Sequence, residues 1–109
     1  MLNSHLEIIA HILIEIEFLR EKRQTLNKAE FVNDETMRRA FVRSLEIIGE
    51  AVKKINIDIK NQYPDIQWRE IAGMRDKLIH DYFGVDYSLV WDVVENKIDD
   101  LKSDLENIE

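Results

Sequence analysis

The sequence predicts an all-α protein, because apolar residues recur at three- and four-residue steps along most of its 109 residues. Hydrophobic residues make up 45% of the chain and charged residues 34%, a balance that suits a compact helical domain and argues against a disordered chain. Three glycines and one proline are too few for the many turns of an all-β fold. We therefore expect a single helical domain over residues 1–109, built as an up-and-down antiparallel bundle of four to five helices.

The first helix is expected over residues 5–24. Ser4, followed three residues later by Glu7, is typical of a capping box at its start. The apolar arc of this helix is wide, which indicates contact on two sides, either with two neighbouring helices or with one helix and a second chain. The residues from about 25 to 33 then read as a connection.

The second helix is expected to begin after Asn33 or Asp34, either of which can act as its N-cap, and to continue to about Lys60. Its apolar face is formed by Met37, Ala40, Phe41, Leu45, Ile48, Val52 and Ile55. Gly49 lies inside this helix, where glycine costs about 1 kcal/mol relative to alanine. Close packing against another helix is the simplest explanation for a glycine at this position.

Two more helices are expected after the break that holds the only proline. Asp65 can cap the third helix, which Gly84 is well placed to end, and Asp86 or Ser88 can cap the fourth. The apolar seam of the fourth helix is formed by Trp91, Val94, Ile98, Leu101, Leu105 and Ile108. Both tryptophans, Trp68 and Trp91, fall on apolar seams and are expected in the core.

The net charge of −7 is unevenly distributed along the chain. Residues 86–109 carry eight acidic and two basic residues, whereas residues 1–85 carry fourteen acidic and thirteen basic ones, so a local basic surface remains possible. The chain has no cysteine, which excludes a disulfide framework and a zinc finger and fits a cytoplasmic protein. Charged residues interrupt the apolar N-terminal stretch, so we expect neither a signal peptide nor a membrane span.

One segment near the end of the third predicted helix combines residues suited to RNA cleavage. Arg75, His80 and Tyr82 follow the spacing R-x-x-x-x-H-x-Y. An arginine guanidinium stays protonated and offers phosphate oxygens a planar fork of donors, while an imidazole titrates near about pH 6.5 and can accept and return a proton. Asp76 lies four residues before His80 and could hold one ring nitrogen, fixing the tautomer. The alternative reading of His80 is an ordinary surface histidine.

A straight helix does not bring Arg75 and His80 together, since at about 100° per residue they lie roughly 140° apart. Tyr82 lies on nearly the same face as Arg75. Two arrangements could build a site: the helix end unwinds before Gly84, or two copies of the helix meet across a twofold axis. In a symmetric dimer one cleft would hold two arginines and two histidines, enough for an acid, a base and phosphate clamps.

Further segments of the chain are similar to a known protein family. They are Ser44–Ala51, Tyr63–Arg75, the positions Leu78, His80 and Tyr82, and the pair Val90 and Trp91. Together they closely resemble the HepT-like branch of the HEPN superfamily over most of the chain. The resemblance implies a HEPN-like homodimer with a metal-independent endoribonuclease site at the interface and no cofactor. It also implies the toxin of a type VII toxin–antitoxin pair.

The resemblance also implies roles for individual residues. Arg75 and His80 match the defining pair of the family. Tyr82 matches the tyrosine that the cognate minimal nucleotidyltransferase antitoxin modifies with AMP, a modification that blocks RNA cleavage. Asp76 stands where the family often has asparagine, so substrate contact or charge at this supporting position can differ here.

The chemistry of Arg75 and His80 and the family resemblance are both consistent with attack of a ribose 2′-hydroxyl on the adjacent phosphate. His80 would handle proton transfer and Arg75 would stabilise negative charge on the phosphoryl group, leaving a 2′,3′-cyclic phosphate and a 5′-hydroxyl end. A second reading is a non-catalytic helical dimer that binds a nucleotide or a protein partner, with Arg75 in an interface salt bridge. A third is an adaptor whose acidic last helix docks a basic protein.

Overall fold

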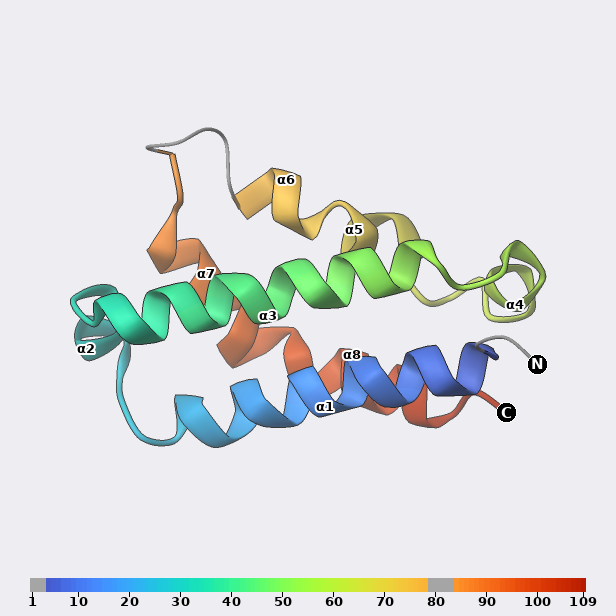
Figure 1. Cartoon of the computed structure of the whole chain (residues 1–109), viewed down its shortest axis with the longest axis horizontal. Coiled ribbons are helices and arrows are strands. Elements are labelled where there is room, and N and C mark those ends of the chain that lie inside the picture. Colours follow the sequence, from blue (N-terminus) through green and yellow to red (C-terminus); the bar gives the residue numbers. More distant parts are fainter. Residues whose placement is uncertain (1–3, 79–83) are drawn as a thin grey trace.

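The structure is a computed structural model that describes residues 4–78 and 84–109. Within these ranges every regular element longer than one residue is a helix, which confirms the all-α prediction. The helices are α1 (His5–Arg23), α2 (Lys28–Val32), α3 (Glu35–Lys53), α4 (Ile57–Gln62), α5 (Trp68–Ala72), α6 (Met74–Leu78), α7 (Tyr87–Asn96) and α8 (Ile98–Glu106). Figure 1 shows that α1, α3, the α5–α6 pair and the α7–α8 pair alternate in direction along the long axis.

Helix α1 begins as the sequence predicts, because the Ser4 side chain accepts a hydrogen bond of 3.3 Å from the backbone N–H of Glu7. One face is fully buried and is formed by Ile9, Ile12, Ile16 and Leu19. This helix packs against α3 and also against α7 and α8, so its wide apolar arc meets neighbouring helices on two sides. Ile14 stays on the outer face with 66% of its surface exposed.

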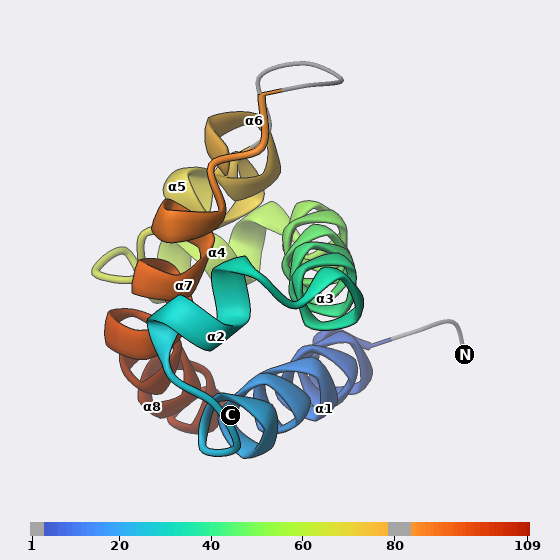
Figure 2. The same ribbon diagram turned by 90° about the vertical axis from the view of Figure 1, so that its left-hand side faces the viewer.

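Helix α2 lies within the stretch that the sequence pattern assigns to a connection, so that prediction was wrong at residues 28–32. The Asn27 side chain and Glu30 form a reciprocal capping box that starts the helix. Its buried Phe31 packs on Phe41 of α3 and on Trp91 of α7, with ring centroids 4.7 and 5.4 Å away. Figure 2 shows α2 closing one end of the molecule between α3 and α7.

Helix α3 is shorter than predicted. It starts after Asp34, whose side chain accepts from the Met37 N–H, but ends at Lys53 instead of continuing to about Lys60. Asn56 explains the break, because its side-chain oxygen accepts a 2.6 Å hydrogen bond from the backbone N–H of Asp58 and so caps the start of the separate helix α4.

The third predicted helix is divided at Gly73 into α5 and α6. The expected cap at Asp65 is also wrong: α5 begins after Gln67, and the N-cap makes no side-chain hydrogen bond. The buried Trp68 fixes this start by donating from Nε1 to the carbonyl oxygen of Tyr63 at 3.0 Å. The expected helix end at Gly84 depends on residues 79–83, which lie outside the described residues.

The close approach predicted at Gly49 is confirmed. Gly49 is buried, and a β-carbon added there would lie 3.3 Å from the carbonyl oxygen of Ala72 on α5. The backbone of α5 therefore rests directly on α3, with no side chain between them at this point.

The last helical segment follows the predicted seam despite a bend at Lys97. Asp86 caps α7 by accepting from the N–H of Leu89 at 2.9 Å. All the predicted seam residues are buried: Trp91, Val94, Ile98, Leu101, Leu105 and Ile108. The backbone N–H of Lys97 still bonds to the carbonyl oxygen of Val93, and Figure 1 shows α8 following α7 along the molecule after this bend.

No helix in the two described ranges is long and apolar enough to cross a membrane.

Candidate functional site

Arg75 is presented on α6, which runs along the outside of α3. The helix is anchored by two apolar side chains that pack on the hydrophobic core: Leu78, which is only 2% exposed, and the half-buried Met74. Since successive residues turn by about 100°, Arg75 lies at the edge of this apolar side, about 60° around the helix from Leu78. Its side chain is 49% exposed, which leaves it accessible to an anion from solution.

The Arg75 guanidinium is held by two carboxylates. Its Nε donates to Oε2 of Glu46 on α3 at 2.8 Å, and its Nη1 lies 3.5 Å from Oδ1 of Asp76. The hydrogen bond to Glu46, followed by the negative charge of Glu46, raises the pKa of Arg75 above its usual value. Arg75 is therefore a cation at every working pH, with Nε bound to Glu46 and Nη1 nearest to Asp76.

Sequence reasoning missed Glu46 as a site residue. It precedes Arg75 by 29 positions and lies on the polar face of α3, where its charge looks like ordinary surface polarity. The signal that could have found it was weak: Glu46 follows the buried Leu45, so it sits at the edge of the face that packs on the rest of the molecule.

His80 and Tyr82 fall within residues 79–83, outside the described residues, so their predicted roles rest on the sequence. The flanks of this stretch are described. The backbone N–H of Asp86 donates to the carbonyl oxygen of Leu78 at 3.2 Å, which joins the start of α7 to the last residue of α6. Asp76, the predicted supporting residue, is 77% exposed and contacts Arg75.

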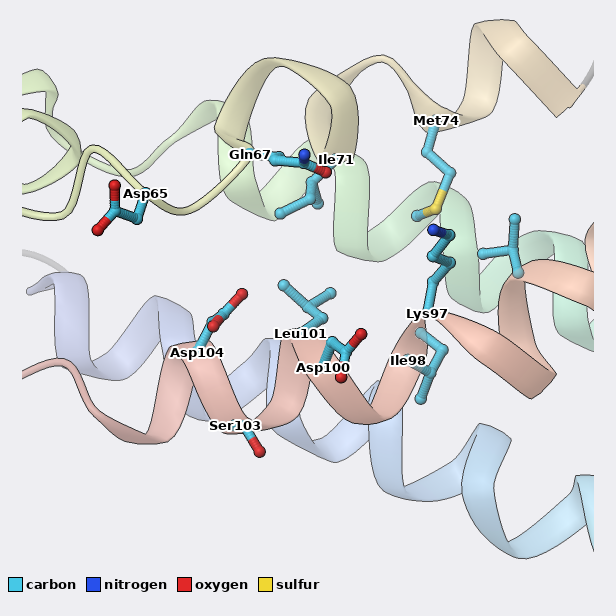
Figure 3. A pocket seen from close by; sticks show the side chains of 11 residues that line it. Asp65, Gln67, Ile71, Met74, Lys97, Ile98, Asp100, Leu101, Ser103 and Asp104 are labelled. Carbon is cyan, nitrogen blue, oxygen red and sulfur yellow. The ribbon is translucent and has the colours of Figure 1, made fainter.

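A groove of about 480 Å³ lies between the α5–α6 pair and the α7–α8 pair. Figure 3 shows Ile71 facing Leu101 and Met74 facing Lys97 across it, with acidic side chains around the rim. The charged residues that line it are Asp65, Asp100, Asp104 and Lys97. Three carboxylates against one ammonium group make this groove unfavourable for a phosphate chain.

Among residues 4–78 and 84–109, no group of three or more histidine, cysteine, aspartate or glutamate side chains is arranged to hold a metal ion. Around Arg75 the described residues present a half-exposed guanidinium that is bound through Nε and can donate to an anion through its other N–H groups.

Comparison with known proteins identifies the family. The model of the family described as "Ribonuclease HepT-like" matches residues 12–108. The "Probable ribonuclease HepT" of Thermococcus cleftensis is 43% identical over 108 residues, which cover 99% of this chain and 98% of that protein. "Putative RNase TTE0752" of Caldanaerobacter subterraneus subsp. tengcongensis is 47% identical over 100 residues, covering 92% and 89%. No solved structure gives a significant match.

The family match spans most of the chain, and both relatives are matched over most of their own length. Residues 12–108 contain all the helices from α2 to α8, and with them Arg75 and its partner Glu46. The chain belongs to the HepT-like ribonuclease family and is an RNA-cleaving enzyme.

Proposed function

We propose that this ribonuclease cuts RNA without a metal ion, using Arg75 to bind the scissile phosphate and His80 to move protons. The observation that carries the proposal is the setting of Arg75: a half-exposed guanidinium bound to α3 in a ribonuclease-family chain. His80 follows it by five residues in the sequence, close enough along the chain to act on the same phosphate.

The chemistry needs one group for charge and another for protons. The ribose 2′-hydroxyl attacks the adjacent phosphorus and loses its proton to an imidazole, the bond to the 5′-oxygen breaks, and that oxygen takes up a proton. Arg75 stabilises the extra negative charge on the phosphoryl oxygens. His80 supplies an imidazole, the side-chain type suited to accepting and returning a proton near neutral pH. The products are a 2′,3′-cyclic phosphate and a 5′-hydroxyl end.

The acid and the base of this reaction are separate groups at any one moment, whereas each chain offers one His80. A homodimer resolves this, because a twofold axis next to α6 would bring two copies of Arg75 and His80 into one cleft. We propose that residues 1–109 act as a single domain whose active form is this dimer. The specific activity should then fall on dilution below the dimer dissociation constant, and activity proportional to subunit concentration throughout would contradict the shared cleft.

RNA should approach from the α3 side of α6. Two exposed cations, Arg39 and Arg43, lie on the outer face of α3 within about 60° of Glu46 by helical phase. Their carboxylate partners are also exposed, so these surface pairs contribute little and can exchange for phosphate contacts. The opposite side of α5–α6 is the acidic groove, which repels the RNA backbone.

The cleavage test uses a single-stranded RNA and the same RNA with one 2′-deoxy nucleotide at the cut. We expect cleavage in EDTA, a cyclic phosphate product, and no cutting at the deoxy position. Arg75→Ala and His80→Ala should each lower kcat/KM by at least about 100-fold while keeping the wild-type unfolding midpoint. Full activity of His80→Ala, or cleavage at the deoxy nucleotide, would sink this mechanism.

We also propose that the enzyme is the toxin of a toxin–antitoxin pair acting on cytoplasmic RNA. Its partner would be a minimal nucleotidyltransferase that attaches AMP to Tyr82. The hydroxyl oxygen of the tyrosine attacks the α-phosphate of ATP, pyrophosphate leaves, and the phenol proton passes to solvent. The added phosphate would compete with RNA for Arg75. Mass spectrometry after incubation with the nucleotidyltransferase and ATP should detect added AMP in the wild type and none in Tyr82→Phe; labelled Tyr82→Phe would contradict the assignment.

A further inference from the structure

We infer that Glu46 is a positioning residue for RNA cleavage: it orients the Arg75 guanidinium from α3 so that the Nη end of the fork faces the scissile phosphate. This inference rests on the proposed function and names a residue that the proposed reaction does not itself assign. Its basis is the 2.8 Å contact between Arg75 Nε and Glu46 Oε2.

The helix that carries Arg75 cannot position the guanidinium by itself. Helix α6 has five residues, and a helix of that length is unstable in isolation. Its apolar anchors, Met74 and Leu78, fix the helix axis but not the direction of the long arginine side chain beside them. A side chain with four rotatable bonds needs a second contact to hold one orientation.

The position of Glu46 on α3 suits it to hold the Arg75 side chain in one orientation. It lies in the middle of the nineteen-residue α3, directly after Leu45, which is 1% exposed. Its side chain is 22% exposed, whereas the carboxylates that pair with Arg39 and Arg43 on the same helix, Glu35 and Glu50, are 67% and 58% exposed. A carboxylate partly shielded from water forms a stronger and better-ordered pair than an exposed one.

The contact also divides the guanidinium into two ends. Nε faces α3 and is occupied by Glu46, and Asp76 lies nearest to Nη1. A phosphate bound by Arg75 would therefore use N–H groups of the Nη end other than the one nearest Asp76. The negative charge of Glu46 slightly opposes phosphate binding. Glu46 therefore orients the Arg75 guanidinium but lowers the affinity of the site for the RNA phosphate. This predicts a separation between kcat and KM.

Three substitutions separate the reach of Glu46 from its charge. Glu46→Gln keeps the length and an oxygen that can accept from Nε, but removes the charge. Glu46→Asp keeps the charge but is shorter by one methylene group and cannot reach Nε from the same backbone position. Glu46→Ala removes both. Glu50→Ala is the matched control, because Glu50 lies one turn further along the same helix face and pairs with Arg43 at 3.9 Å.

We expect kcat to fall by about 10- to 100-fold in Glu46→Asp and Glu46→Ala, the loss typical of a misplaced catalytic contact. Glu46→Gln should restore kcat to within about threefold of the wild type, and KM should stay constant or decrease in Glu46→Gln and Glu46→Ala. Glu50→Ala should keep the wild-type kcat. The inference is overturned if Glu46→Asp is as active as the wild type, or if Glu46→Gln loses as much kcat as Glu46→Asp.

A second measurement does not depend on activity. The NMR signal of the Arg75 Nε–H, identified by its loss in Arg75→Lys, should exchange slowly with water in the wild type and in Glu46→Gln, and rapidly in Glu46→Asp. A slow signal in an enzyme that cuts no RNA would refute the proposed function while leaving the contact intact. A signal that exchanges equally fast in all variants would refute the positioning role even in an active ribonuclease.

Discussion

Helix α3 has two sides that are built differently. The side toward α1, α2 and α7 is a dry core in which Phe41 and Ile48 are fully buried and the aromatic rings of three helices meet. The side toward α5 and α6 is joined by a backbone contact at Gly49 and an ion pair at Glu46. Burial of apolar surface dominates folding stability, whereas a site needs exposed groups with fixed directions. The first side should therefore control stability and the second should control activity.

The largest effect is expected in the core. Phe41→Ala removes a buried ring that packs against both Phe31 and Trp91, and should lower the free energy of unfolding by about 3–5 kcal/mol, as measured by urea denaturation. The kcat per folded molecule should stay unchanged. Ile14→Ala is the control, because a side chain that is 66% exposed should change stability by only about 0.5 kcal/mol. A similar loss in both variants would show that the core is not where stability lies.

Gly49→Ala should produce the opposite pattern. Alanine is the better helix former by about 1 kcal/mol, but its β-carbon would lie 3.3 Å from the Ala72 carbonyl oxygen and would push α5 outward. These effects oppose each other, so the unfolding free energy should change by less than about 1 kcal/mol. The kcat should fall about tenfold or more, because α6 and Arg75 move with α5. Unchanged kcat would break the proposed link between this contact and the site.

The division between the two sides also explains what the sequence could predict. Predictions from local signals were confirmed. Asp34 and Asp86 cap helices through their own side chains. The apolar residues from Trp91 to Ile108 are buried, because their spacing along the helix places them on one face. Breaks inside helical patterns were missed. The apolar periodicity continues through Ile55 and Ile59, yet Asn56 starts a new helix there. The Gly73 break likewise interrupts a pattern that reads as one helix.

The candidate site was predictable only in part for a related reason. Arg75 was singled out because its motif is local in the sequence, but its partner Glu46 is distant, and nothing in the spacing of α3 connects the two. Pairing across 29 residues depends on how α6 rests on α3, which Gly49 and the Ala72 backbone decide. The proposed roles of His80 and Tyr82 remain predictions from sequence.

The smallest effect is expected at the polar edge between α1 and α8, which is neither core nor site. Asp99 accepts hydrogen bonds from Arg23 at 2.8 Å and Arg20 at 2.9 Å, and these hold its pKa below the usual 3.8 against a partial desolvation. The charged carboxylate is thus favoured in the folded state. Its stabilisation is present above pH 3.8 and is lost as the pH falls through the lowered pKa.

Asp99→Asn should therefore reduce the unfolding free energy by about 1 kcal/mol or less at pH 7, because Asp99 is half exposed. Urea denaturation at several pH values should show the difference from the wild type disappearing below pH 3.8. Asp100→Asn, next to it on α8, makes no ion pair with another described residue and serves as control. A difference that persists in acid would mean that packing, not charge, explains the effect.

The positions of the two tryptophans give the enzyme a pair of built-in fluorophores. Trp91 lies in the aromatic cluster behind α3, and Trp68 lies at the start of α5, where its indole donates to Tyr63. Replacing either one by phenylalanine leaves a single tryptophan, and selective excitation of that indole reports on one neighbourhood only. Trp68 emission can thus follow rearrangement of the segment leading to Arg75 during RNA binding, while Trp91 emission follows global unfolding.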